Sequence, residues 1–430
     1  MASSPVSAQD PDQAWLLSEG VRARLEFGLP ATSNGVAQLM GSVSDVGSEE
    51  WGFPMTAAEA KAVDVGGRMK YESEFDESVV KFVRSLPTYA GVSFDQRDGG
   101  RPTVRLTHLD EATVTAIRDL DPDPTRGMRV LAVKTSYWDL VAAAERGEAA
   151  LRAEDRSVPF NGVGVDVLGN RVRFYVDPGF IVDPGIQSRL EHTLGVDVTF
   201  AAKARANDTA CTTNRSNCAN PMKAGIRIDR GNVGNAWWCS LGWIVSDGAD
   251  EQFLTAGHCG YGTPHQWYHG GYGSGAFGTE IDYPDGPDGT LYRAGGKDVM
   301  RVSLPDAQAS RQIFDEGGVV QMKATATPLV GQAIVYSGAR TDQLVTGTVT
   351  DDWLSWISDT ANPDITVWGS DASWTTLKGD SGAPVYRRVF VTSPVPGWQI
   401  TPVGLNSNAQ GNFARAFDGT QAWGLTMFNQ

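Results

Sequence analysis

Two kinds of hydrophobic pattern divide the chain into a first and a second part. In the first part, apolar residues recur three and four positions apart in DESVVKFVRSL (76–86) and DEATVTAIRDL (110–120), which predicts helices. RVLAVKT (129–135) and RVRFYVD (171–177) instead alternate apolar and polar residues, as strands do. The pattern therefore predicts an α+β fold for residues 70–206.

This α+β part also repeats an order of elements. YAGVSFD (89–95) and FNGVGVD (160–166) match, and each is followed by a glycine-containing turn, a second strand, a helix and a third strand. We predict two ββαβ units of roughly 70 residues each, packed as a pair of small subdomains. Residues 1–69 show only weak patterns among scattered Pro, Ser, Gly and Asp, so we expect a segment that is partly disordered or helical.

From residue 207 the pattern changes to short apolar runs, such as LGWIVS, GQAIVYSG and ITPVGLNS, separated by tight turns. This second part holds 30 of the 49 glycines and ten of the 13 tryptophans. Such spacing predicts an all-β body over residues 207–430. The boundary falls in AAKARANDTACTTNRSNC (201–218), where small and polar residues replace any apolar period.

The charge of the chain narrows the class of partner. The formal net charge is -15 and the isoelectric point about 4.8, whereas affinity for nucleic acid depends on Lys and Arg neutralising phosphates, so we expect no nucleic-acid partner. The chain contains no apolar run of about 18 residues, so we predict no membrane-spanning helix. The opening MASSPVSAQDPDQAW lacks the basic and apolar regions of a signal peptide, which leaves a protein that stays inside or one whose leader has been removed.

All four cysteines, Cys211, Cys218, Cys239 and Cys259, lie within one short stretch of the chain. An even number in one stretch favours two disulfides and an oxidising compartment. A tetrahedral zinc site built from the four thiolates is the alternative, although no CxxC pair is present.

Two short motifs carry candidate chemistry. GDSG (379–382) is typical of a turn, because Gly, Asp and Ser favour turns, and Ser381 becomes a nucleophile only beside a base. TAGHC supplies a histidine, His258, shortly after the strand QFLT. A core histidine fixed beside a disulfide is the alternative for His258, but the two motifs in this order favour a nucleophile and its base.

The two motifs make the chain resemble the chymotrypsin-fold serine peptidases, in particular the secreted bacterial branch of the streptogrisins and α-lytic protease. WCSLGWIVSDGADEQFLTAGHC resembles the strands that lead to that family's catalytic histidine, and the resemblance covers about residues 208–430. It implies an all-β, double six-stranded β-barrel with His258 as base and Ser381 as nucleophile. The third member is a buried aspartate between them. Asp298, just before the strand VMRVSL, is favoured over Asp282, which enters a turn rich in Pro and Gly.

The resemblance also assigns an oxyanion hole. It implies that the backbone N–H groups of Gly379 and Ser381 bind the oxyanion of the tetrahedral intermediate. Asp380 is implied to be a buried acid, but the sequence does not identify its partner. No IVGG-like start stands near residues 200–226, so activation by insertion of a new N-terminus is not expected.

By the same resemblance Cys239 pairs with Cys259, and the other two cysteines then pair with each other. His265 and His269 stand in a glycine-rich loop with no nearby carboxylate or cysteine pattern. We therefore predict that both are surface histidines, and that the protein needs no metal and no cofactor.

Candidate substrate residues follow from the family pattern. Ser407, Asn408 and Ala409 match the edge strand along which a peptide adds, with Ala409 where relatives have glycine. Thr375 stands at the floor of the primary pocket and carries no charge, so we predict uncharged or apolar residues before the cleaved bond (P1). The alternative for Thr375 and its neighbours Trp374 and Thr376 is that they are core strand residues.

Together these patterns predict a secreted, monomeric serine endopeptidase that hydrolyses proteins or peptides through an acyl-enzyme, with residues 1–206 as its pro-region. An independent binding domain is the alternative for the first part. For the whole chain, an esterase with the same triad and a non-catalytic binding or scaffold protein on a protease fold remain as alternatives. No membrane partner is expected.

Overall fold

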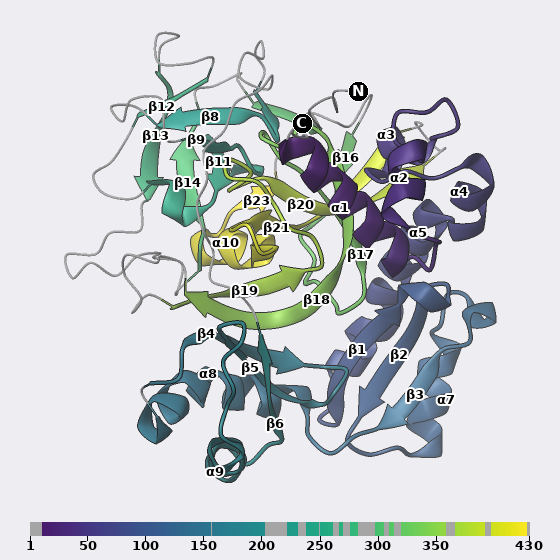
Figure 1. Ribbon diagram of the computed structural model, residues 1–430, viewed down its shortest axis with the longest axis vertical. Helices are drawn as coiled ribbons and strands as arrows, with labels where there is room; N and C mark the ends of the chain where they lie inside the picture. The colour runs from purple at the N-terminus through teal and green to yellow at the C-terminus, as the bar shows by residue number, and fades with distance from the viewer. Residues whose placement is uncertain are drawn as a thin grey trace, which may run out of the picture.

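The computed structural model combines helices and strands in the first part of the chain with mostly strands in the second (Figure 1). It describes residues 11–155, 157–202, 222–230, 238–248, 250–260, 266–269, 276–282, 297–304, 309–313, 320–357, 366–391 and 397–427. No helix among these residues is long and apolar enough to cross a membrane.

Short helices dominate residues 11–84. They are α1 (Pro11–Glu26), α2 (Ser33–Leu39), α3 (Gly47–Trp51), α4 (Ala57–Val63), α5 (Val65–Phe75), the π-helical turn η1 (Asp76–Val80) and α6 (Lys81–Arg84). Local caps explain two boundaries. Thr56 and Glu59 form a capping box at the start of α4, and Asp64 takes a left-handed conformation where α4 ends and α5 begins. The described part of residues 1–69, for which the sequence left disorder and helix open, is therefore largely helical.

Two groups of elements follow in the same order of strand, strand, helix and strand. They are β1 (Tyr89–Asp95), β2 (Arg101–Leu106), α7 (Glu111–Asp119) and β3 (Arg129–Ala132), and then β4 (Phe160–Asp166), β5 (Arg171–Val176), α9 (Pro184–Leu194) and β6 (Val198–Ala202), with α8 (Tyr137–Glu154) between the groups. In both groups the first two strands are antiparallel and the last two parallel. This order agrees with the predicted ββαβ units, while their equivalence as repeats stays a prediction.

Six strands of the second part close a ring. They are β17 (Ala333–Ser337), β18 (Leu344–Ile357), β19 (Thr366–Ala372), β20 (Pro384–Val391), β21 (Gly397–Asn406) and β22 (Asn412–Arg415). The pairing runs β17–β20–β21–β22–β19–β18, and β18 pairs back with β17. Helix α10 (Ala416–Trp423) follows the ring and packs against β21.

A second sheet lies beside the ring. In spatial order its strands are β23 (Thr426–Met427), β10 (Ile244–Ser246), β11 (Glu251–Thr255), β14 (Met300–Ser303), β13 (Ala276–Asp282), β12 (Gln266–Tyr268), β8 (Arg227–Arg230) and β9 (Trp238–Ser240). The end strands β23 and β9 do not pair with each other in the described residues. Within that part of the chain one closed ring is therefore present, and the double six-stranded barrel stays a prediction.

Three further strands complete the second part. Strand β7 (Met222–Ala224) pairs in parallel with β15 (Ala309–Ile313), and β16 (Val320–Met322) pairs in parallel with β21 of the ring. These strands lie outside the cycle of pairs that closes the ring.

A shared sheet joins the first part to the second. Strand β4 pairs with β18, with Gly164 opposite Leu354 and Gly162 opposite Trp356. A Cβ at Gly162 would lie 2.1 Å from the Ser355 carbonyl oxygen, so this close approach requires glycine. The sheet therefore crosses the boundary that the sequence predicted between two domains.

A shared apolar core also joins the two parts. Helix α5 packs against β20 and β17, and helices α1 and α3 pack against β18 (Figure 1). The core cluster contains Trp51 of α3 and the loop residues Phe27, Phe53 and Met55 from the first part, and Trp243, Leu344, Tyr386 and Ile400 from the second part. Burying one such side chain is worth roughly 1.5–3 kcal/mol, so each part stabilises the other. Most of the predicted boundary segment, residues 203–218, lies outside the described residues.

Candidate active site

Three side chains from separate segments meet in a line of hydrogen bonds. His258 lies in the 3₁₀ turn η4 (Gly257–Gly260) after β11, Asp298 lies just before β14, and Ser381 lies in the turn before β20. His258 Nδ1 is 2.8 Å from Asp298 Oδ2, and His258 Nε2 is 2.9 Å from Ser381 Oγ. The structure thus brings together the three residues that the resemblance assigned to a catalytic triad.

Asp298 is fully buried and held by hydrogen bonds. Its Oδ1 accepts the His258 backbone N–H at 2.8 Å, and its Oδ2 accepts the Ser407 hydroxyl. Burial by itself opposes ionisation, but the His258 ring and these hydrogen bonds outweigh it and lower the pKa of Asp298 below its usual value. An ionised carboxylate here favours the tautomer with a proton on Nδ1, which leaves Nε2 able to accept the Ser381 proton.

The turn around Ser381 requires glycine at two positions. Gly379 has φ +107° and Gly382 has φ +84°, backbone conformations that favour glycine, and a Cβ at Gly382 would lie 2.0 Å from Thr255 Oγ1. Ser240 in β9 ties this turn to the other sheet. Its hydroxyl donates to the Gly379 carbonyl at 2.8 Å and its N–H to the Ser381 carbonyl at 2.7 Å. The GDSG motif is therefore a constrained turn at the junction of the ring and the second sheet.

Two backbone N–H groups in this turn are available to a ligand. In the described part of the protein, neither the N–H of Gly379 nor that of Ser381 donates to a protein acceptor. Both belong to the residues that the resemblance assigned to the oxyanion hole. Preorganised N–H donors beside a nucleophile stabilise the negative charge that develops on a substrate carbonyl.

Asp380 is fully buried and held by backbone N–H groups. Its Oδ1 accepts from Arg340 and Thr341 at 2.8 and 3.0 Å, and its Oδ2 accepts from Leu377 at 3.2 Å and from the Thr341 hydroxyl. Burial raises the pKa of Asp380, while these hydrogen bonds act in the opposite direction. A Cβ at Gly338 would lie 2.1 Å from Asp380 Oδ1, so glycine makes room for the carboxylate. These residues are the partners that the sequence did not identify.

A disulfide lies beside the histidine. The Cys239 and Cys259 Sγ atoms are bonded and link β9 to η4. A loop of this size is worth about 3 kcal/mol in the chain-entropy model. His258 and the two cysteines gather three atoms of metal-ligating type, but a disulfide leaves neither sulfur free to act as a thiolate ligand. The other predicted pair, Cys211 with Cys218, lies outside the described residues.

Of the two histidines predicted to lie on the surface, the structure describes His269 and not His265. His269 is only 7% exposed, and its Nδ1 is 2.7 Å from the Arg227 carbonyl oxygen, so the prediction of a surface histidine is wrong at this position. The reason is that β12 pairs with β8 and so brings His269 against that carbonyl. His265 and the side chain of Asp282 lie outside the described residues.

The segment expected at the floor of the primary pocket touches the segment expected to bind the peptide along its edge. The N–H of Thr376, next to Thr375, donates to the Ala409 carbonyl at 3.1 Å, and Thr376 Oγ1 donates to the Asn408 carbonyl at 2.8 Å. Ser407 lies at the triad end of the same segment, where its carbonyl oxygen is 3.3 Å from Ser381 Oγ. The segment after Thr375 and the segment 407–409 are therefore hydrogen-bonded directly to each other.

Helix α1 lies on Thr375, a contact that sequence reasoning missed. Trp15 Nε1 donates to Thr375 Oγ1 at 2.9 Å. Glu19 Oε1 accepts from the Thr375 hydroxyl at 2.6 Å and from its backbone N–H at 3.3 Å. The expected floor of the primary pocket is therefore hydrogen-bonded to the first part of the chain.

Arg22 and Glu26 continue the same face of α1. Arg22 donates to the Ser373 hydroxyl at 2.9 Å and to the Thr346 carbonyl at 2.8 Å, and Ser373 Oγ donates to Glu26 at 2.9 Å. The signal in the sequence is the three- and four-residue spacing of polar side chains in PDQAWLLSEGVRARLE. That spacing predicts one face of a helix but does not say what the face contacts.

No protein-family model matches the chain. Among solved structures, the chain is similar to a serine protease specific for glutamic acid, at 23% identity and a TM-score of 0.34, over 48% of this chain and 100% of that chain. It is also similar to the α-lytic protease homologue N4, at 21% identity and a TM-score of 0.34, over 48% and 98% of the two chains. Protease A of Thermobifida fusca is similar at 22% identity and a TM-score of 0.33, over 48% and 98%.

Proposed function

We propose that this protein is a secreted, chymotrypsin-type serine endopeptidase that hydrolyses peptide bonds through an acyl-enzyme. The observation that carries the proposal is the hydrogen-bonded line from buried Asp298 through His258 to Ser381 Oγ. Such a line activates a hydroxyl that is otherwise a weak nucleophile at neutral pH. The disulfide between Cys239 and Cys259 supports an oxidising, extracellular location.

The reaction uses the geometry as follows. Ser381 Oγ attacks the substrate carbonyl carbon and passes its proton to His258 Nε2, and the ionised Asp298 stabilises the imidazolium. The negative carbonyl oxygen accepts from the N–H groups of Gly379 and Ser381. His258 then gives its proton to the leaving amine, and a water molecule activated by the same imidazole hydrolyses the acyl-enzyme.

The first part, residues 1–206, acts in this proposal as a pro-region that assists folding and then inhibits. The core that the helices share with the second part supports assistance in folding, because a separated second part exposes that apolar surface. The hydrogen bonds of Trp15 and Glu19 to Thr375 support inhibition, because Thr375 is the expected floor of the primary pocket. The next residue, Thr376, is bonded to Ala409 of the expected peptide-binding edge. Self-cleavage within residues 201–210 then separates the two parts.

Ser381→Ala tests nucleophile and processing together. Loss of a triad nucleophile costs about a million-fold in kcat, so the variant should hydrolyse neither peptide nor ester substrates and should remain one uncut chain. Rates with chromogenic substrates and the mass of the purified chain measure both. Ser246→Ala, which removes a hydroxyl at the end of β10, is the matched control and should behave like the parent. More than about one per cent of parental activity in Ser381→Ala would contradict the proposal.

The freed second part should prefer small uncharged residues before the cleaved bond. Thr376, Asn408 and Ala409 carry no charge, and Ala409 adds a methyl group where relatives have glycine. One methylene in a fitted pocket changes kcat/KM by about 10- to 200-fold, so a tetrapeptide substrate ending in Ala should exceed its Phe counterpart at least about tenfold. The measurement compares kcat/KM for substrates ending in Ala, Phe, Lys and Glu. A maximum for Lys or Glu would show that the pocket is built differently.

A further inference from the structure

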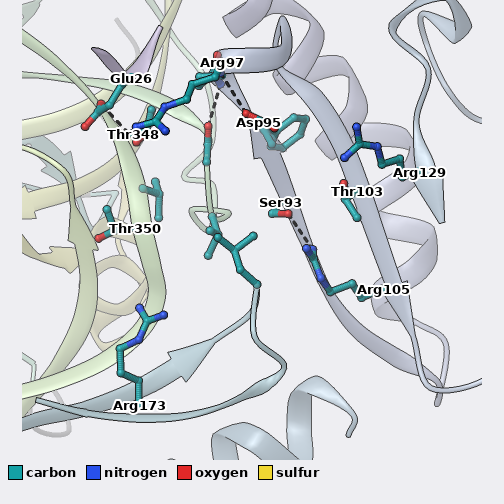
Figure 2. A pocket seen from close by; sticks show the side chains of 16 residues that line it. Glu26, Ser93, Asp95, Arg97, Thr103, Arg105, Arg129, Arg173, Thr348 and Thr350 are labelled. Carbon is teal, nitrogen blue, oxygen red and sulfur yellow. Dashed lines mark hydrogen bonds between the residues drawn. The ribbon is translucent and has the colours of Figure 1, made fainter. Parts of the chain in front are cut away.

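A cavity of about 560 Å³ lies between the two parts of the chain, away from the triad. Its walls include Thr103 and Arg105 from β2, Arg129 from β3 and Arg173 from β5 in the first part, and Thr350 from β18 in the second. Figure 2 shows these side chains around the space. Arg129 and Thr350 are exposed, so the cavity is open to solvent. Its volume is in the range of sites that hold small organic molecules.

Strand alternation explains why polar side chains line this space. Val92, Phe94 and Val104 are buried in the apolar core of the first part, while Ser93 and Arg105 lie on the opposite face of the same sheet. Solvent normally covers such a polar face. Here the second part covers it and leaves Ser93 only 3% and Arg105 only 7% exposed. The Arg105 side chain is therefore almost fully buried, although the cavity that it lines is open to solvent.

Arg105 has no counter-ion among the described residues. Its guanidinium carries five N–H donors, and the structure uses one side-chain bond, from Nη1 to Ser93 Oγ at 2.8 Å. Asp166, the acid that acts on it from a distance, is already paired with Arg171 and Arg173 at 2.9 and 2.6 Å. Burial lowers the pKa of Arg105, which reflects the cost of enclosing a cation without an anion.

The other charges around the cavity do not provide that anion. The charged side chains of the lining are Arg97, Arg105, Arg129 and Arg173 and the two acids Glu26 and Asp95. Arg129 and Arg173 pair with acids that are not part of the lining, and Glu26 pairs with Arg22 at 2.8 Å. Arg97 and Arg105 are then left with Asp95 alone, whose Oδ1 accepts the Arg97 backbone N–H. The lining therefore keeps an excess of positive charge.

A hydroxyl beside Arg105 adds a second donor. Thr103 is 7% exposed, and its side chain has no hydrogen-bond partner in the described part of the protein. Thr103 and Arg105 lie on the same face of β2 and line the same space (Figure 2). A guanidinium and a hydroxyl that line one cavity suit an oxyanion, because both groups can donate to its oxygens.

We propose that this cavity binds a small molecule carrying a carboxylate or phosphate group, with Arg105 as the main ligand and Thr103 as a second donor. Both parts of the chain form the walls, so the bound anion stabilises the joined state over the separated parts. This role is independent of the proposed hydrolysis, because the triad contributes no residue to the cavity.

The test uses the full chain carrying Ser381→Ala, which removes the proposed nucleophile and keeps the two parts in one polypeptide. Its melting temperature and its heat of binding are measured with citrate, with inorganic phosphate and with NaCl at matched ionic strength. A saturable rise with citrate supports a carboxylate ligand, and one with phosphate supports a phosphate ligand. Equal effects of all three salts would overturn the proposal, because they would reflect ionic screening only.

Variants in the same background assign the binding to this cavity. Arg105→Met removes the charge at similar side-chain length and should weaken anion binding at least about tenfold, the usual effect of losing a charge-assisted pair. Thr103→Val keeps the shape but removes the hydroxyl, so it should weaken binding several-fold and serves if Arg105→Met does not fold. Arg118→Met removes an exposed arginine from α7 and should bind like the parent. Parental affinity in Thr103→Val, or in a folded Arg105→Met chain, would place the anion elsewhere and overturn the proposal.

Discussion

At the scale of single residues, the state of Asp298 decides whether the triad geometry can work. A carboxylate with no exposed surface is costly to ionise, yet three hydrogen bonds, from the His258 backbone, the His258 ring and Ser407, stabilise its charged form. The order of TAGHC and then GDSG in the sequence says nothing about the pKa of Asp298. That pKa follows from where the strand after Asp298 places the carboxylate.

Asp298→Asn should leave the fold intact and remove the chemistry. An amide at this position holds the imidazole in the wrong tautomer, and the same change in a chymotrypsin-type triad lowers kcat about 10,000-fold. Steady-state kinetics and a melting curve measure the two effects separately. Asp250→Asn, at an exposed position before β11, is the matched control and should keep parental kcat. Activity of Asp298→Asn within about tenfold of the parent would mean that another acid orients His258.

At the scale of elements, helix α1 and the segment before Ser381 form one unit. Four polar side chains of α1, spaced three or four residues apart, contact Ser373, Thr375 and the strand β18. Buried or half-buried hydrogen bonds to charged groups contribute about 1.5–3 kcal/mol each, so this face holds the helix in one position. The expected inhibition therefore depends on these contacts rather than on chain connectivity alone.

Glu19→Ala combined with Trp15→Ala should raise the hydrolysis of a short ester by the purified protein. Losing about 1.4 kcal/mol at this contact raises the fraction of molecules in which α1 has left the pocket about tenfold. We therefore expect the rate of ester hydrolysis to rise about tenfold. The initial rate before further processing is the quantity to compare with the parent. Ser18→Ala changes another residue of the same helix, one that makes no hydrogen bond to Thr375 in the described part of the protein, and should leave the rate unchanged. Unchanged ester hydrolysis in the double variant would separate α1 from inhibition.

At the scale of the whole molecule, a buried carboxyl lies where the two parts meet. Glu72 on α5 has no exposed surface, and its oxygens accept from Gln96 Nε2 at 2.5 Å and from the Ala333 backbone N–H at 2.9 Å. Burial raises the pKa of Glu72 to about 7, although these bonds act against the rise. Asp352 on β18 behaves alike, because burial raises its pKa to about 6. Both groups make the joined state sensitive to pH.

The joined chain should lose stability as pH rises through about 7. Because the pKa of Glu72 is raised above its unfolded value, the stabilisation is fully present below about pH 4.5 and is lost as the carboxyl ionises, which amounts to about 3 kcal/mol. Melting temperatures between about pH 5 and 8 should fall less steeply in Glu72→Gln than in the parent. Glu74→Gln alters an exposed acid of the same helix and should follow the parent. Parallel curves for Glu72→Gln and the parent would show that Glu72 does not titrate in this range.

The sequence alone determined those features whose causes lie within a few neighbouring residues. Strands β1 and β4 coincide with YAGVSFD and FNGVGVD, because short segments of this kind bounded by glycine-containing turns are recognised from neighbouring residues alone. The glycines of GDSG likewise predict a turn from local sequence, since Gly379 and Gly382 adopt positive φ, a conformation that few other residues adopt. The identities of Ser381 and His258 as candidates followed from such local motifs and from the resemblance that they carry.

The tertiary structure alone decided which distant surfaces meet. Nothing local in FNGVGVD indicates that β4 pairs with β18, and nothing in α1 indicates that Glu19 reaches Thr375. The partners of Asp380 and the enclosure of Arg105 have the same origin, because each depends on a segment remote in the sequence. Contacts between helices and strands that are remote in the sequence depend on the shape, burial and charge of both surfaces. These properties are set only when the whole chain has packed.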